Sequence, residues 1–234
     1  MKRKYHLTFS MDWAPDSSIQ LCLDILSEYK AKATFFATHQ TELNNEILRQ
    51  GHELGIHPNF MPNSSHGNTT KEIIDKCLEF APNARLMKTH SLFQSTPLFV
   101  EIFSSYKQLT TDLSLFMHEA RHVQKCQFAL DGVSFTRVLY NWEDDADFVK
   151  KNFQFDKERF FGDINIFDFH PIHIHLNSTN GSEYLALKNS LSNKKLNDLR
   201  VTEVDKFSNP GLGMRDFLRA TLESNSQLIN LEDI

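Results

Sequence analysis

Short apolar runs alternate with amphipathic stretches along this chain. Residues 5–9 and 33–37 are mostly apolar runs of strand length, and residues 16–29 between them repeat apolar side chains at helical spacing. This pattern predicts a strand, a helix that begins at Asp16 or Ser17, and a second strand.

The same alternation continues toward the C-terminus. Asp131-Gly132 is a hairpin turn signal, and Thr69 to Glu72 resembles the capping box of a helix start. Repeated strand–helix units predict an α/β fold, either a closed barrel or an open doubly wound sheet, in one domain over residues 1–234. The further strands are expected at 52–57, 85–90, 109–116, 121–141 and 165–176, and the further helices at about 42–50, 69–81, 96–107 and 145–153, before a helical C-terminal part.

Potential metal ligands follow two of the predicted strands. Asp12 comes after the first strand, His57 ends the strand at 52–57, and His66 lies in the loop beyond it. In parallel sheets, chemistry gathers at the C-terminal strand ends. One carboxylate and two imidazoles commonly hold a divalent ion and leave positions open for water. We therefore predict a metal site, with Zn²⁺ as the expected ion; the alternative is that Asp12 caps a turn and His57 is a hydrogen-bonded core histidine.

Residues 165–176 carry three histidines in an apolar segment. If the segment is a strand, His173 and His175 share one face. A histidine at a strand end suits a general acid, because its free pKa is near neutrality. We favour His170 for this role, since Pro171 cannot donate to a sheet and marks a break there. The alternative is that these histidines form hydrogen bonds within a polar interior.

Three consecutive carboxylates, Glu143, Asp144 and Asp145, follow Trp142. They can orient a histidine or an arginine, or raise one another's pKa. A solvated helix N-terminus is the alternative explanation.

His118 to His122 matches the H-E-x-x-H motif of zinc metalloproteases. That motif needs a helix that brings both histidines to one face, whereas the flanking residues have strand character. We expect no zinc between His118 and His122.

Composition narrows the class of protein. The net charge is −5 and no basic block occurs, which argues against a nucleic-acid or membrane-surface partner. No apolar run is long enough to span a membrane, and no apolar stretch follows the basic N-terminus as in a signal peptide. The three cysteines are far apart, so we expect a cytoplasmic protein without a disulfide framework. The 11 histidines, mostly clustered, favour a metal or acid–base site.

Taken together, these segments resemble the polysaccharide deacetylase family, the NodB-homology group of metal-dependent carbohydrate esterases. The resemblance covers roughly residues 5–176. Its five motifs correspond here to Thr8–Asp12, Gly51–His57, Lys88–His90, Trp142–Asp145 and Phe169-His170.

The resemblance implies a distorted (β/α) barrel and metal-dependent hydrolysis of an N- or O-acetyl group on a sugar. Surface-polysaccharide or lipopolysaccharide assembly is the setting it suggests, and His170 would be the general acid. The residues expected to contact the acetylated carbohydrate are Lys88, His90, Trp13 and Trp142.

The chain departs from the family pattern in three places. Ser10 stands where the family has the aspartate that takes a proton from water, and a serine hydroxyl is not a base at neutral pH without help. His57 and His66 are nine residues apart, whereas the family's metal histidines usually lie four apart. Lys88 replaces an arginine, and the two are not equivalent.

These departures leave alternatives. Asp144 or Asp145 is expected to replace the missing base or to orient Lys88. The rival from another class is a carbohydrate-binding or scaffolding protein that kept the fold and lost the base. A metalloprotease that uses His118 and His122 is a third, less favoured possibility.

Overall fold

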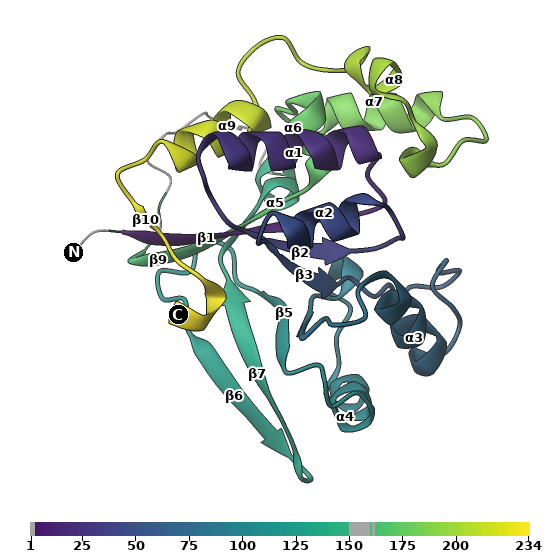
Figure 1. Cartoon of the computed structure of the whole chain (residues 1–234), viewed down its shortest axis with the longest axis vertical. Helices are drawn as coiled ribbons and strands as arrows, with labels where there is room; N and C mark the ends of the chain where they lie inside the picture. The colour runs from purple at the N-terminus through teal and green to yellow at the C-terminus, as the bar shows by residue number, and fades with distance from the viewer. Residues whose placement is uncertain (1–2, 150–159, 161) are drawn as a thin grey trace.

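The computed structural model describes residues 3–149, 160 and 162–234. One curved sheet runs through it in the strand order β6-β7-β5-β4-β3-β2-β1-β9-β8, with β10 beside β1 (Figure 1). The strands are β1 (Lys4–Ser10), β2 (Thr34–Ala37), β3 (Glu53–Ile56), β4 (Leu86–Met87), β5 (Thr111–Phe116), β6 (Lys125–Leu130), β7 (Val133–Tyr140), β8 (Trp142–Glu143), β9 (Ile164–Phe169) and β10 (Gln227–Leu228).

Helices connect most of these strands, as the alternating pattern predicts. Thr69 caps α3 through a reciprocal capping box with Glu72. In Figure 1, α1, α6 and α9 lie together above β1 and β9, while α3 and α4 lie near the opposite end of the sheet. The helices are α1 (Asp16–Glu28), α2 (Leu43–Arg49), α3 (Thr70–Phe80), α4 (Thr96–Ser105), α5 (Asp144–Val149), α6 (Pro171–Leu176), α7 (Ser182–Ser190), α8 (Val201–Asp205) and α9 (Met214–Leu222), with short 3₁₀ turns at His90–Leu92, Leu196–Asp198 and Leu231–Asp233.

The sheet curls so that its two halves meet, which gives the expected distorted barrel. β7 pairs with β5, and after the single residue Asn141 the chain continues as β8, which pairs with β9. Asn141 joins the two sides, because its Oδ1 accepts a hydrogen bond from the backbone N–H of Ile166 at 2.9 Å. The antiparallel β6–β7 hairpin turns at Asp131-Gly132, where both residues have positive φ, as the turn signal predicts.

Aromatic side chains from the central strands form part of the hydrophobic core. The ring of Phe9 on β1 stacks on Phe35 of β2 at 4.7 Å and on Phe169 of β9 at 5.8 Å. All three side chains are fully buried. This packing fixes the central strands, so the residues that follow β1 and β9 are held on a rigid support.

One expected strand is in fact two elements. Residues 165–176 are not a single strand, since β9 ends at Phe169 and α6 begins at Pro171. Proline is favoured at the first position of a helix, where its missing N–H costs nothing. His173 and His175 therefore lie on a helix and not on one face of a strand. The helix expected at 145–153 is α5, and its last predicted residues lie outside the described part of the chain.

Within the described residues, no helix is long and apolar enough to cross a membrane.

Candidate active site

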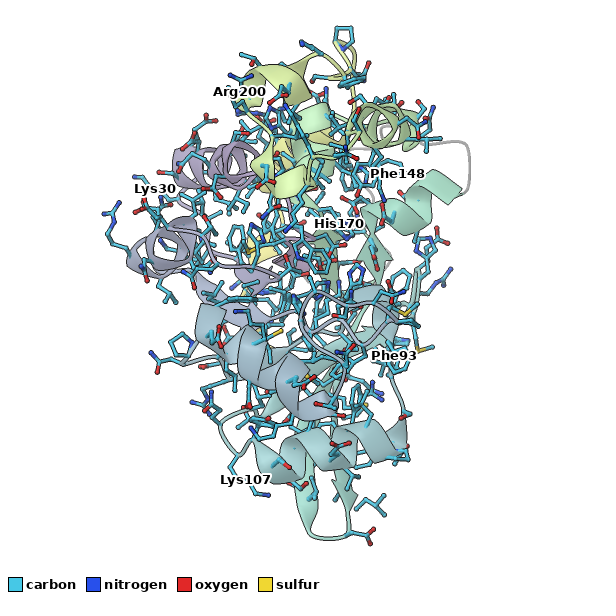
Figure 2. The ribbon with its side chains drawn as sticks, turned by 90° about the vertical axis from the view of Figure 1, so that its right-hand side faces the viewer. Lys30, Phe93, Lys107, Phe148, His170 and Arg200 are labelled. Atoms are coloured by element: carbon cyan, nitrogen blue, oxygen red, sulfur yellow. The ribbon has the colours of Figure 1, made fainter. Side chains whose placement is uncertain are left out.

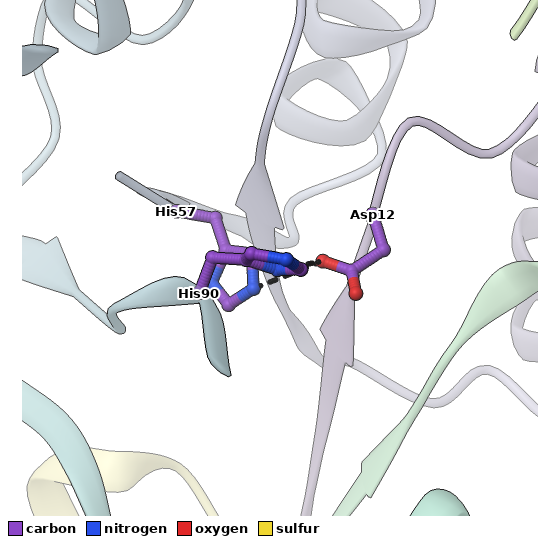
Figure 3. Close-up of side chains that lie close together, drawn as sticks. All are labelled: Asp12, His57 and His90. Atoms are coloured by element: carbon purple, nitrogen blue, oxygen red, sulfur yellow. Dashed lines mark hydrogen bonds and ion pairs between the residues drawn. The ribbon is translucent and has the colours of Figure 1, made fainter. Parts of the chain in front are cut away.

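Three side chains of metal-binding type meet beyond the ends of β1, β3 and β4. Nε2 of His57 lies 3.0 Å from Oδ1 of Asp12, and Nδ1 of His90 lies 3.1 Å from the same oxygen (Figure 3). One potential ligand atom of each residue lies within 4.8 Å of the others. Asp12 and His57 thus lie together, as their positions after neighbouring strands predict, and His90 joins them.

The backbone brings these side chains inward. Asp12 and Trp13 both have positive φ, of 41° and 54°, so the chain turns sharply directly after β1. Aspartate tolerates this left-handed region better than most residues do. His57 follows β3, and the backbone N–H of His90 donates to the carbonyl oxygen of Pro58 at 2.9 Å. These strand-end turns aim all three side chains at one point.

The hydrogen bonds of His57 favour a cation between it and Asp12. Nδ1 of His57 lies 2.6 Å from the carbonyl oxygen of Lys88, which can only accept, so Nδ1 carries the hydrogen. Burial lowers the pKa of His57 below its ordinary value, although Asp12 opposes the shift. In the neutral ring, the lone pair of Nε2 then faces a carboxylate oxygen. Two acceptors 3.0 Å apart need a positive species, so this donor set fits a metal ion.

Asp12 is held as a carboxylate. Burial raises its pKa, but the neighbouring imidazoles of His57, His90 and His170 outweigh burial and hold the pKa well below its usual range. An ionised carboxylate is the form in which aspartate binds a metal.

His66 does not offer a lone pair to this site. Its Nδ1 accepts a hydrogen bond from the backbone N–H of Asn59 at 3.1 Å, and its Nε2 donates to the carbonyl oxygen of Thr38 at 2.7 Å. Both ring nitrogens are therefore engaged by the backbone. The expected set of Asp12, His57 and His66 is corrected here, because the structure gathers His90 in place of His66. The ring of His66 instead packs against Trp13, with centroids 5.3 Å apart.

His170 faces the same cluster from the other side. Its Nδ1 donates to Oδ1 of Asp144 at 2.6 Å, and its Nε2 lies 3.5 Å from Oδ2 of Asp12. Burial lowers the pKa of His170, but the charges of Asp144 and Asp145 and the hydrogen bond to Asp144 outweigh burial and raise the pKa well above its ordinary value. Figure 2 shows His170 near the middle of the molecule.

A buried ion pair lies beneath the cluster. Lys88 pairs with Asp168 on β9, and its Nζ also donates to Oγ of Ser10 at 3.1 Å. Ser10 donates to Oδ2 of Asp168 at 3.0 Å, and Thr8 donates to Oδ1 at 2.6 Å. Burial lowers the pKa of Lys88, but the charges of Asp168 and Glu143 outweigh it and raise the pKa. Asp168, and neither Asp144 nor Asp145, is the carboxylate that orients Lys88.

A cavity of about 100 Å³ connects these groups. The cluster of Asp12, His57 and His90 lines it, together with the imidazole of His170 and the side chain of Lys88. The residues that line it are Ser10, Asp12, His57, Lys88, Thr89, His90, Ser91, Leu92, Glu143, Asp145 and His170.

Three other expected site residues have different surroundings. Trp142 is fully buried, 5.0 Å from the ring of Phe217, and this burial corrects the expectation that it contacts substrate. Trp13 is half-buried, and its ring lies 5.3 Å from that of His90, at the site itself. Asp145 lines the cavity and pairs with Nε2 of His173 at 2.9 Å.

The H-E-x-x-H segment is not a protease site. Residues 117–124 form no helix, and Glu119 has a φ of 58°. The motif requires both histidines on one helical face, so this segment lacks the geometry for zinc that the metalloprotease alternative needs.

The sequence patterns assign no separate role to two residues of the site, Asp168 and Glu143. Asp168 sits in an apolar run, where a single charged residue is itself a signal of a buried partner. Glu143 is one of three consecutive acidic residues, which sequence alone does not distinguish. The register of β8 separates it from the other two, because it pairs Glu143 with Asp168.

Comparisons with known proteins agree with the fold. The family model described as "WbmS-like: Polysaccharide deacetylase" matches residues 7–188. A crystal structure from Bordetella bronchiseptica, of a protein assigned as a polysaccharide deacetylase involved in O-antigen biosynthesis, is 31% identical. That match has a TM-score of 0.80 and covers 96% of this chain and 91% of the other. A family 4 carbohydrate esterase from Bacillus anthracis is more distant, at 14% identity and a TM-score of 0.43, covering 94% of this chain and 84% of the other. Among curated protein sequences, none matches significantly.

The chain belongs to the WbmS-like polysaccharide deacetylase family. Membership makes it a hydrolase of the kind that cleaves amide or ester bonds.

Proposed function

We propose that this protein removes an acetyl group from a sugar in a reaction that depends on a divalent metal ion. The observation that carries the proposal is the meeting of Asp12, His57 and His90 with His170 around one cavity. Family membership gives the reaction class, and this geometry supports the proposal of a metal site with a proton donor beside it.

Asp12, His57 and His90 would hold the ion. A divalent cation there supplies a Lewis acid that polarises the acyl carbonyl and makes water more acidic. Zn²⁺ suits one carboxylate and two imidazoles, which are common ligands of this ion. The carbonyl oxygen of Lys88 fixes the tautomer of His57 by accepting its Nδ1–H, as a support of this kind does in known metal sites.

His170 is the proposed proton donor for the leaving amine or alkoxide. Asp144 holds the ring through Nδ1, so Nε2 is the atom left to face the cavity. Asp144 is fully buried and is committed to His170. We therefore assign Asp144 the role of positioning His170 and not that of a replacement base.

The proposed substrate is an acetylated sugar of a surface polysaccharide or of a precursor of one. Support comes from the similar Bordetella bronchiseptica structure, whose protein is assigned to O-antigen biosynthesis. The small polar cavity suits an acetyl group better than a long acyl chain.

Acetate release tests the proposal. Purified protein is incubated with N-acetylglucosamine oligosaccharides, nucleotide-linked N-acetylhexosamines and acetylated xylan, and free acetate is measured. We expect release from at least one member of this panel, loss of release with a chelator and recovery on adding Zn²⁺ or Co²⁺. Asp12→Asn is the matched inactive control. Binding of these sugars without any acetate release by metal-loaded protein would favour the carbohydrate-binding alternative.

A further inference from the structure

We propose that Glu143 is the general base of this site and that it replaces the carboxylate missing at Ser10. The inference rests on the proposed deacetylation. Glu143 is the residue of the acidic run that comes from a strand, β8, and it lines the cavity together with Ser10 and Asp12.

The sheet register places Glu143 on the same face of the sheet as Ser10. In parallel β8 and β9, Glu143 is paired with Asp168, and in parallel β9 and β1, Asp168 is paired with Thr8. Paired residues of neighbouring strands project to the same face. Ser10 lies two residues beyond Thr8, so it is on that face as well. One ligand-type atom of Glu143 lies within 4.8 Å of one in Asp168 and one in His170.

The side chain of Glu143 is anchored at one oxygen. Tyr140 donates its hydroxyl hydrogen to Oε2 at 2.6 Å. Among the described residues, none donates a hydrogen bond to Oε1. A carboxylate held by one oxygen keeps the other available to accept a proton, which is the geometry that a general base needs.

The electrostatics of Glu143 suit this role. Burial raises its pKa, Lys88 opposes the shift and Asp168 adds to it, so the net pKa is above the ordinary glutamate value. A more basic carboxylate is a better proton acceptor near neutral pH.

The other carboxylates of the site, those of Asp144, Asp168 and Asp145, are held by hydrogen bonds or ion pairs to other side chains. Both oxygens of Asp144 accept hydrogen bonds from His170. Asp168 is fully buried, bonded to Lys88, Ser10 and Thr8, and absent from the cavity lining. Asp145 pairs with His173; although burial raises its pKa, the imidazoles of His170 and His173 outweigh burial and lower it.

In the assigned step, Glu143 takes a proton from a water molecule as the water oxygen bonds to the acyl carbon. The bond from that carbon to the sugar nitrogen or oxygen then breaks, and His170 gives a proton to the leaving amine or alkoxide. Acetic acid and the deacetylated sugar depart. The proton on Glu143 passes to His170 through solvent, which restores both groups.

Glu143→Gln and Glu143→Ala test this assignment on the metal-loaded, full-length protein. Glu143→Gln keeps an oxygen that can accept from Tyr140, and we expect it to lower kcat by ~10²–10⁴ with metal content unchanged. Added formate is expected to restore part of the turnover of Glu143→Ala, because a small carboxylate fills the vacated space. Glu79→Gln, on the exposed face of α3, is the matched control.

The results that would contradict the Glu143 assignment can be told apart from those that would contradict deacetylation itself. Glu143→Gln that retains wild-type kcat, or Glu143→Ala that formate does not rescue, overturns the assignment while leaving deacetylation standing. A larger loss in Asp145→Asn than in Glu143→Gln moves the base to Asp145. A metal-loaded wild type that releases no acetate overturns the proposed function and this assignment with it.

Discussion

Asp144 holds His170 at two points. Its Oδ1 accepts the ring Nδ1–H at 2.6 Å, and its Oδ2 accepts the backbone N–H of the same residue at 2.8 Å. The pair joins the start of α5 to the end of β9, so one carboxylate fixes both the ring orientation and the turn that carries it.

Asp144→Asn should therefore impair proton donation. An amide can accept only through its oxygen, so one of the two donors on His170 would lose its partner. We expect kcat to fall by ~10²–10⁴ while the bound metal remains. Turnover and metal content of the variant are the measurements. Unchanged kcat would mean that His170 is not the proton donor or does not need Asp144.

The buried pair of Lys88 and Asp168 should dominate local stability. Removing one partner leaves an uncompensated buried charge, and Asp168→Asn or Lys88→Met should each cost about 3–5 kcal/mol of unfolding free energy. Urea denaturation measures this loss. The exposed pair of Lys76 and Glu79 is the control, and Lys76→Met should cost about 1 kcal/mol or less. Equal losses at the two sites would contradict the role of the buried pair.

Ser10→Asp should not simply restore the family's base. Oγ of Ser10 lies 3.0 Å from Oδ2 of Asp168, so a second carboxylate would face the first. We expect Ser10→Asp to destabilise the fold, by up to several kcal/mol for close like charges. Adding Asp168→Asn should recover much of this stability, since one carboxylate again serves Lys88. Thermal unfolding of the single and double variants provides the comparison; additive losses would argue against this coupling.

His6 should make the fold sensitive to acid. Burial lowers its pKa from 6.5 to about 4, against the opposing hydrogen bond to the carbonyl oxygen of Ile229. Between these values the unfolded chain binds a proton that the folded chain does not, so stability is full above pH 6.5 and falls as the pH drops toward 4.

Protonation of His6 should lower the free energy of unfolding by about 3 kcal/mol between pH 6.5 and a pH below 4. We expect His6→Gln to be less stable at pH 7 and to show a flatter dependence of unfolding free energy on pH between about 4 and 6.5. An unchanged slope in His6→Gln would assign the acid sensitivity to other groups.

The strands and most helices could be predicted because their apolar spacing is local. The strand Tyr5–Phe9 and the capping box at Thr69 needed only neighbouring residues. The prediction of one strand over residues 165–176 is wrong, because an apolar run has no period that separates a buried strand from a buried helix. Pro171 marked the break, but its role as the first residue of a helix depended on where β9 ended.

Less of the site could be predicted from the sequence, because the site is built from contacts between distant segments. His66 and His90 both follow predicted strands, and sequence spacing did not tell which one reaches Asp12. The choice depends on backbone partners of His66, at Asn59 and Thr38, that no pattern reveals. The pairing of Lys88 with Asp168 likewise depends on a separation of 80 residues.

The metal content of three purified proteins tests whether Asp12, His57 and His90 together hold a metal ion. Wild type, His90→Ala and His66→Ala are each loaded with Zn²⁺, freed of excess ion and analysed by mass spectrometry. We expect about one equivalent in wild type and in His66→Ala, and a clear loss in His90→Ala, because an Asp-His-His site loses a ligand only there. A wild type that binds no zinc, or a loss in His66→Ala with full content in His90→Ala, would contradict the proposed site of Asp12, His57 and His90.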